Sequence, residues 1–549
     1  MNALLNRRVA GLVASALIPL AVLGVFFVLP VWGMLSRGLF VDGHLDLGAV
    51  LQVVGRPEIQ RAVWFTLWSS TAGTTLALVL GLPAAYVLHR LHFPGRTALR
   101  AFLVVPFVLP TVVVGVAFEQ LIGRTGPLGF LGLDGTPAAI VAGLVFFNAS
   151  VVIRVVGGAW ESLDPRPAEA AAALGAGPWQ VLRDVTVPAL RPALVSAATV
   201  VFLFCATAFG IVLTLGGLRW SSVETQIYLL TTNLLDLQGA AALSILQLLV
   251  VTGLLLGAAR ARRTTDATVA RDRARRRRPT RGDLPAVVAT ALLLILVAAP
   301  VATLVVTSLR VDGTWSLAYY RALQTPGSHQ ALLVPVTTAL VNSVRIAVDA
   351  TWMSLAMGLS IALIVTRRSR TRPERRLRGV LDGLFMLPLG VSAVTLGFGF
   401  LITLGKPPLD LRDSPLLIPI AQALVALPLV VRILVPILGG VDDRLRQAAA
   451  TLGAPPWRTL LVVDLPVVWR PLLAAAGFAF ACSLGEFGAT SFLVRDDRPT
   501  LPVVIYRLIG HPGALNYGMA LAASVVLGLA TALVMFAVER LRVPSVGAF

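Results

Sequence analysis

The chain has 549 residues, of which 57% are hydrophobic and only 13% are Asp, Glu, Lys or Arg, about half the charged fraction of a soluble protein. The formal net charge is +19, and Lys406 is the single lysine among 46 basic residues. This composition excludes a soluble enzyme. It also argues against nucleic acid as a partner, because the charge lies in loops between hydrophobic segments.

Twelve hydrophobic segments follow one another, each long enough to cross about 30 Å of hydrocarbon. We therefore expect an all-α polytopic membrane protein that contacts membrane lipid. The termini and alternate loops carry 31 Arg, against 12 Arg or Lys in the opposite loops, so the positive-inside rule predicts that both termini are cytoplasmic. The segments lie near residues 10–36, 63–88, 101–122, 137–160, 192–215, 239–259, 284–308, 338–366, 379–404, 415–440, 472–494 and 516–539.

An internal repeat divides the chain into two halves. At an offset of 278 residues, 154–188 falls on 432–466, with matching Arg, Asp, Ala, Leu, Gly, Trp and Pro positions. Between the halves, residues 260–283 carry ten Arg and three Asp, which we interpret as a solvated cytoplasmic linker. The predicted domains are residues 1–259 and 284–549, each with six spans in the same orientation.

Each half carries an Ala-rich polar loop between its fourth and fifth spans, at residues 161–190 and 441–470. In the first loop Asp164 can cap a helix, Pro165 fits its first turn, and Gly175 can adopt the left-handed conformation that ends it. We expect Pro178 to begin a second short helix that ends before Pro188.

The second loop repeats this pattern. Asp442 or Asp443 is the expected cap, Gly453 the terminator, and Pro456 the start of the next helix. Consecutive Ala residues leave little side-chain bulk, so another protein can approach the helix backbone closely. Two such helices on the cytoplasmic side predict docking points for a two-fold partner.

The first loop, "EAAAALGAGPWQVLRDVTVP", resembles the EAA loop of permease subunits in ATP-binding-cassette (ABC) importers of bacteria. The resemblance covers nearly the whole chain and occurs twice, at matching positions. It implies a fused, tandem type I importer permease in the bacterial cell membrane, made of two six-helix domains. Its partners would be two copies of an ATPase subunit and an extracytoplasmic solute-binding protein.

The resemblance also implies which residues contact the ATPase. One departure from the family pattern is Gln447, which stands where the first loop has Glu169, so the two docking sites should be unequal. The implied ATPase-coupling residues are Glu169, Ala170, Ala171, Gly175, Gln447, Ala448, Ala449 and Gly453.

No pattern in the sequence predicts a catalytic residue, a metal site or a cofactor. A Walker A loop needs Gly-Lys-Ser/Thr to hold phosphate, and Lys406 is followed by Pro407, so ATP hydrolysis must come from another chain. His89 and His92 lie in a basic loop, where solvated side chains are a better interpretation than metal ligands. Cys205 and Cys482 fall within spans and are interpreted as small buried residues.

Ionisable residues within spans are the remaining candidates, because they are costly in hydrocarbon. Glu119 and Glu486 have no acidic counterpart in the other half, where Gly397 and Ala208 stand. Either carboxylate could border the path of a cationic solute, or could have a local hydrogen-bonded role. Arg154 and Arg432 are repeat equivalents for which snorkelling or helix-end pairing is expected.

The segments "FGIVLTLGG", "VETQIY" and "SLGEFGATSFL" resemble the ferric iron and thiamine branch of these importers, and sulfate and molybdate stay open as solutes. The competing class is an ion-coupled secondary transporter, which can also be built from parallel six-helix repeats. A membrane scaffold or sensor that moves no solute is a third class. The two Ala/Gly docking loops favour the ATPase-driven importer.

Overall fold

The computed structural model describes residues 2–41, 44–217, 219–263, 277–367, 369, 371–407 and 409–540. In these residues the protein is built of helices, with two short antiparallel hairpins, β1 (Phe40–Val41) with β2 (His44–Leu45) and β3 (Arg310–Val311) with β4 (Thr314–Trp315). The first-half helices are α1 Asn2–Leu23, α2 Leu29–Leu39, α3 Leu47–Gly55, α4 Pro57–Arg90, α5 Arg96–Val104, α6 Thr111–Ile122, α7 Pro137–Glu161, α8 Arg166–Ala173, α9 Pro178–Val181, α10 Val187–Ala206, α11 Gly210–Gly216, α12 Val223–Thr232 and α13 Leu237–Arg263.

The second half repeats this order. Its helices are α14 Leu284–Ser308, α15 Ala318–Ala322, α16 Val336–Thr366, α17 Arg372–Phe385, α18 Ala393–Thr403, α19 Leu417–Gly439, α20 Asp443–Thr451, α21 Pro456–Thr459, α22 Leu465–Leu484, α23 Thr490–Leu493, α24 Leu501–Gly510 and α25 Ala514–Arg540. The bounds of α10 and α22, and those of α12 and α24, coincide at the 278-residue offset. The repeat seen in the sequence is therefore a repeat of structure.

Ten of the twelve predicted spans overlap helices that are long and apolar enough to cross a membrane, counted over the described residues. Two of the ten, 192–215 and 472–494, run past the ends of their helices, which lie at Ala206 and Leu484. The segment 101–122 is instead a pair, Arg96–Phe107 and Thr111–Ile122, bent by 104°. The segment 379–404 is also broken, between α17 and α18. The long helices expose large apolar side chains such as Trp64, Leu67 and Trp68 of α4, as a surface that faces lipid requires.

The expected end of the short helix before Pro188 is wrong, and the equivalent helix of the second loop also continues past its proline, Pro466. The chain stays helical from Pro178 to Ala206 and from Trp457 to Leu484. Just before each proline lies one π-helical turn, Leu182–Thr186 or Leu460–Asp464. A proline has no N–H to donate and crowds the preceding turn, and the wider π turn accommodates it without ending the helix.

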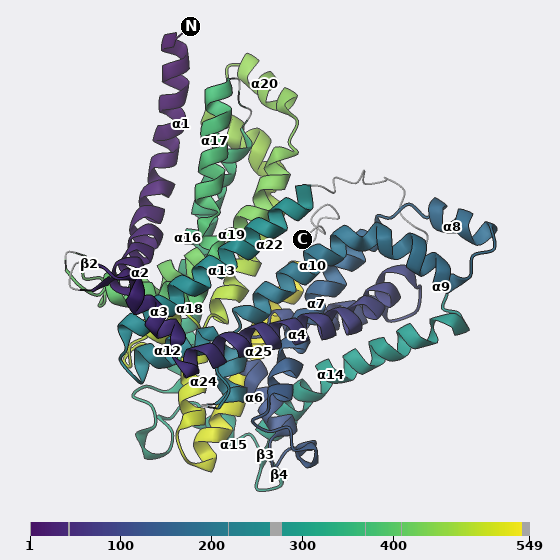
Figure 1. Cartoon of the computed structure of the whole chain (residues 1–549), viewed down its shortest axis with the longest axis vertical. Coiled ribbons are helices and arrows are strands. Elements are labelled where there is room, and N and C mark those ends of the chain that lie inside the picture. Colours follow the sequence, from purple (N-terminus) through teal and green to yellow (C-terminus); the bar gives the residue numbers. More distant parts are fainter. Residues whose placement is uncertain are drawn as a thin grey trace.

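The two halves exchange their first helices. Helix α1 packs against α16 and α17 of the second half, and α14 packs against α4 and α6 of the first. Figure 1 shows two diverging arms, one that ends in α20 at the top and one that ends in α8 at the right. We call the ends of these arms the loop end, and the opposite end, where β3, β4 and α24 lie, the far end.

The linker lies partly outside the described residues, since 264–276 are not described. The sequence predicts a solvated linker, but its described last part, residues 277–283, is held by hydrogen bonds. The Arg277 guanidinium donates to Asp283 at 2.6 Å and to the Tyr86 hydroxyl of α4 at 2.6 Å. His92 N–H also donates to Arg277 O at 2.8 Å, so the linker's end is tied to the first half. The Asp283 hydrogen bond, partly opposed by burial, raises the pKa of Arg277.

Candidate functional site

Four helix breaks meet between the two halves. Two lie before α6 and α18, at residues 108–110 and 391–392, and two lie after α10 and α22, at residues 207–209 and 485–489. Irregular backbone leaves N–H and C=O groups unpaired, so within a membrane it is tolerated only inside protein or beside a cavity. These breaks border a cavity of about 730 Å³.

The cavity is mainly aromatic and aliphatic. Among the described residues that line it are six phenylalanines: Phe107, Phe147, Phe204, Phe209, Phe478 and Phe487. The polar side chains are Thr111, Asn148, Thr199, Thr207, Ser392, Arg432, Cys482 and Glu486. The volume is of the order that holds a small organic molecule, and one acidic and one basic side chain leave the lining close to neutral.

Glu486 is buried at the cavity wall and caps a helix. It accepts backbone N–H bonds from Ala489 at 2.7 Å and from Thr490 at 3.0 Å, and a further bond from the Thr490 hydroxyl. Glu486 thus has the local hydrogen-bonded role considered from the sequence, and it also lies beside the cavity. Glu119 is not among the cavity-lining residues; it lies in the last turn of α6, where Tyr517 of α25 hydrogen-bonds it.

The two span arginines turn toward the other half. Arg432 lines the cavity, and the Arg154 guanidinium lies over the ring of Phe478, 5.5 Å from its centroid. Arg154 therefore contacts the other half, and Arg432 borders the cavity. Cys482 lines the cavity, whereas Cys205 is buried and receives a hydrogen bond from Asn148 at 3.4 Å.

Glu224 is a buried carboxylate that sequence analysis missed. It lies in α12 outside the predicted spans, accepts a hydrogen bond from Gln247 of α13, and accepts another from the Ser392 hydroxyl at 3.0 Å. Because Ser392 belongs to the second half and lines the cavity, this bond ties the halves together at the cavity wall. The available signal was the acidic residue of the segment "VETQIY", which the sequence analysis uses only for its family resemblance.

The loop end carries the two Ala-rich helices, α8 and α20. Asp442 is the N-cap of α20 and accepts from Arg444 N–H at 2.9 Å, as predicted. Asp164 accepts from Arg166 N–H at 3.0 Å, but the N-cap position of α8 is Pro165. Gly175 and Gly453 have φ of +90° and +78°, the left-handed conformation predicted for both. The two loops thus share one backbone path.

Both loops present apolar side chains to solvent at their tips. Leu174 and Leu452 are 90% and 87% exposed, and Trp179 and Trp457 are 70% and 64% exposed. Leu174 and Leu452 lie outside the candidate spans, whereas Trp179 and Trp457 lie at the start of the helices Pro178–Ala206 and Trp457–Leu484. Exposed apolar side chains outside a span are typical of interaction surfaces. Beside them, the predicted coupling residues Glu169, Ala170 and Gly175, with Gln447, Ala448 and Gly453, are exposed, and Ala171 and Ala449 are half-buried.

The two loops are attached to their arms differently. In the second half, Asp464 is buried and accepts from Arg446 at 2.8 Å and from Arg367 at 2.7 Å. Arg446 also bonds Asp443 at 2.9 Å, so α20 is clamped to the π turn and to the end of α16. This clamp was missed, because nothing in the sequence pairs residues 367, 446 and 464.

The first half has no such clamp at the equivalent described positions, which are His89, Ala168 and Thr186. His89 is instead buried at the end of α4, with Nδ1 3.0 Å from the Glu161 carboxylate. The expectation that His89 is solvated in a loop is wrong, because α4 continues to Arg90 and packs this turn against Gly157 of α7. Among the described residues no cluster of three or more His, Cys, Asp or Glu side chains could hold a metal ion.

Comparison with known proteins adds independent findings. A family model described as "Binding-protein-dependent transport system inner membrane component" matches residues 77–311 and 329–543. The chain is 28% identical over 494 residues to the thiamine transport system permease protein ThiP of Brucella abortus (strain 2308), covering 87% of each chain.

Two further relatives cover most of the chain. ThiP of Escherichia coli (strain K12) is 28% identical over 470 residues, which are 82% of this chain and 83% of that protein. The ferric transport system permease protein FbpB of Actinobacillus pleuropneumoniae is 24% identical over 551 residues, which are 95% of this chain and 77% of that protein.

Proposed function

The chain belongs to the family of binding-protein-dependent transport system inner membrane components, as the permease of an ABC importer, and from this premise we propose that its solute is thiamine. The observation that carries the choice is the cavity lining. Six phenylalanines suit a flat organic ring, whereas a ferric ion prefers hard oxygen ligands and would meet one carboxylate, Glu486, already engaged in capping α23. The relatives named for thiamine agree with this choice.

A separate ATPase subunit, present in two copies, supplies the energy. Each copy contacts one loop, through Glu169, Ala170, Ala171 and Gly175 in the first and through Gln447, Ala448, Ala449 and Gly453 in the second. Support comes from the exposure of these helices and of Leu174 and Leu452 at the tips of both arms. A solute-binding protein delivers the solute at the far end.

The mechanism is alternating access. Closure of the ATPase pair on ATP draws the two loops together, and the arms carry this movement to the cavity between them. Both termini and the linker at 260–283 lie on the cytoplasmic side, and the predicted halves, 1–259 and 284–549, move against each other. Glu486 borders the path, while Glu119 would meet solute only beyond the cavity, toward the far end.

Reconstitution tests this function. The chain is placed in proteoliposomes with its ATPase and binding protein, and uptake of radiolabelled thiamine is measured with and without ATP, with radiolabelled iron as the competing solute. We expect thiamine uptake that requires all three proteins and ATP. Uptake by the chain alone in a proton gradient would instead identify an ion-coupled secondary transporter.

Two further measurements address the solute and the topology. Mass spectrometry of the small molecule that copurifies with the binding protein should identify thiamine, and iron or an oxyanion there would overturn the choice of solute.

The topology is tested by labelling. A cysteine introduced into the linker should be labelled only from the cytoplasmic side. Labelling from outside intact cells would reverse the orientation.

A further inference from the structure

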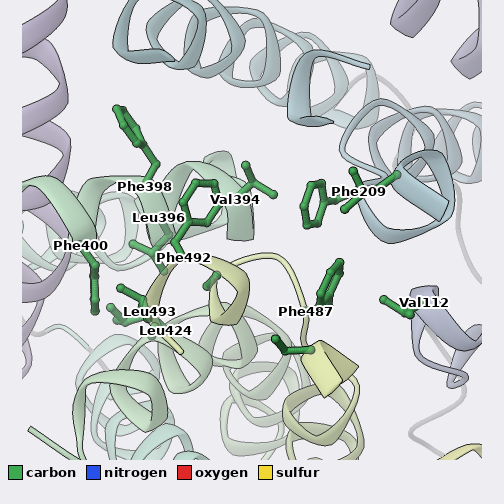
Figure 2. Close-up of a cluster of buried hydrophobic side chains, with 14 of the residues drawn as sticks. Val112, Phe209, Val394, Leu396, Phe398, Phe400, Leu424, Phe487, Phe492 and Leu493 are labelled. Carbon is green, nitrogen blue, oxygen red and sulfur yellow. The ribbon is translucent and has the colours of Figure 1, made fainter. Parts of the chain in front are cut away.

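Two repeat-equivalent phenylalanines stack on each other where the two halves meet. Phe209 and Phe487 have ring centroids 5.2 Å apart and planes inclined by 20°. Each comes from a helix break, after α10 in one half and after α22 in the other. Figure 2 shows the two rings near each other, one from each half. Residues related by the repeat can meet in this way only close to the pseudo-two-fold axis.

A second pair of repeat equivalents supports the stack from behind. Tyr228 of α12 lies against Phe209 with centroids 5.3 Å apart, and Tyr506 of α24 lies against Phe487 at 5.5 Å. Neither tyrosine lines the cavity. Each half therefore supplies a Phe backed by a Tyr, so each Phe ring is held by its own half while it contacts the ring of the other half.

The stack closes the cavity toward the far end. Phe209 and Phe487 line the cavity, yet they are only 5% and 2% exposed. Of the helices that continue toward the far end, α6, α11 and α18, only residues in the first two positions border the cavity: Thr111, Ile211, Ala393 and Val394. The cavity thus ends at the level of the two stacked rings.

We propose that Phe209 and Phe487 form an aromatic gate that closes by stacking on itself and opens by taking a flat ring of the solute between its two rings. The inference rests on the proposed function, because thiamine carries flat heteroaromatic rings. Aromatic pairs interact favourably at centroid distances of about 4.5–7 Å. When the halves separate, each Phe can exchange its partner ring for a face of the solute.

The pairing makes the gate selective for a solute that carries a flat ring. A solute with a flat ring replaces the Phe–Phe contact on both faces, whereas an aliphatic or hydrated solute leaves both rings without a stacking partner. The gate also couples opening to the movement of the halves, since each ring belongs to a different half. A cationic ring gains further from the electron-rich ring faces.

The test uses leucine, which keeps apolar bulk but removes the ring. Thiamine uptake is measured for Phe209→Leu/Phe487→Leu with the partner proteins. The matched control is Phe26→Leu/Phe400→Leu, because these rings also pack between the two halves, 6.3 Å apart, but do not line the cavity. We expect the gate variant to lose at least about tenfold in kcat/KM while the control loses less than about threefold. Equal losses in both variants, or normal uptake in the gate variant, would overturn the inference.

A second measurement reports closure without reference to the solute. Cys205 and Cys482 are replaced by Ala, Phe209 and Phe487 by Cys, and a protease site is inserted in the linker so that the halves separate on a gel. A short bifunctional thiol reagent should keep the halves joined in the resting protein and fail to do so when binding protein and ATP analogue hold the assembly. Equal cross-linking in both states would contradict the gate.

The two measurements separate failure of the gate from failure of the proposed function. If the wild-type protein imports no thiamine while the cross-link depends on state, thiamine as the solute is wrong, ring insertion fails with it, and the closing role of Phe209 and Phe487 stands. If the wild-type protein imports thiamine and the leucine variant does so equally, the inference fails and the function stands.

Discussion

The two loops at the ends of the arms have the same backbone but different attachments. At the start of both α8 and α20 an Asp carboxylate accepts a backbone N–H, and both helices are followed by a glycine of positive φ. The hydrogen bonds at their ends are equivalent, Ala176 N–H to Ala171 O and Ala454 N–H to Ala449 O, both 3.0 Å. Only the second loop, among the described residues, is clamped through Asp464. The shape of each loop is therefore set by the Asp and Gly residues at its own helix ends. Its attachment to the arm depends on residues that are distant in sequence.

The largest effect should follow from removing the shared feature. We expect Gly175→Val/Gly453→Val to abolish most ATP-driven uptake, because a β-branched residue at positive φ costs on the order of 1–3 kcal/mol at each loop. A Cβ meets nothing within 4 Å at either site, so backbone strain is the cause within the chain. The cost is small against insertion of the apolar spans, so the variant should still reach the membrane.

A matched control lies two residues away. Gly177 has φ of −66°, and a Cβ there would meet only the Gln180 side chain at 3.8 Å. Gly177→Val should therefore retain uptake. Binding of the ATPase and uptake are scored separately, and normal assembly with normal uptake in the double glycine variant would refute the coupling role of both loops.

The next largest effect should distinguish the two loops. Asp464→Asn leaves Arg446 without its buried carboxylate, and loss of one partner of a buried pair costs about 3 kcal/mol or more. This would raise the population of the detached second loop by on the order of 100-fold. Trypsin should then cut this loop faster at Arg444 or Arg458, both exposed.

The first loop provides the internal reference for this experiment. Its cleavage at Arg183 should be unchanged by Asp464→Asn, and the equivalent change Thr186→Asn should alter neither loop strongly. If Asp464→Asn leaves the cleavage of the second loop as it is in the wild-type protein, the clamp does not hold α20.

The smallest effect concerns the residue that differs on the docking surface itself. Glu169→Gln should weaken ATPase binding by less than about fivefold, since an exposed ion pair contributes about 0.2–1 kcal/mol. The loss should shrink at high salt, because exposed charges are screened. Gln447→Glu is the reciprocal variant. Titration of ATPase binding that shows no change in either variant would mean that this position makes no ionic contact.

Much of the fold could be predicted from the sequence because its signals are local. The 278-residue repeat is visible when the two halves of the sequence are compared. The Asp residues at the helix starts and the two left-handed glycines depend only on the residues next to them. The helix breaks within 101–122 and 379–404 could not be predicted from hydropathy. The residues at these breaks line an apolar cavity and are themselves mostly apolar, so they look like the rest of a span. The helices continue through Pro188 and Pro466 because a π turn accommodates each proline. No pattern of residues predicts such a turn.

The candidate site divides in the same way. The Ala/Gly loops and Glu486 were found from residue types, whereas Asp464, Glu224 and the Phe209–Phe487 stack depend on contacts between distant segments. His89 was misplaced because one more turn of α4 buries it. A single sequence identifies which residues are unusual for their segment, and the packing decides what they contact.

The central claim, that ATP draws the two loops together, can be tested by one distance measurement. Spin labels are attached to cysteines introduced at Arg183 and Leu461, exposed repeat equivalents beside the two loops, after Cys205 and Cys482 are replaced by Ala. The label distance is measured by pulsed electron paramagnetic resonance in the assembled importer. The account predicts a shorter distance when ATP is trapped and a return after hydrolysis; an unchanged distance would contradict it.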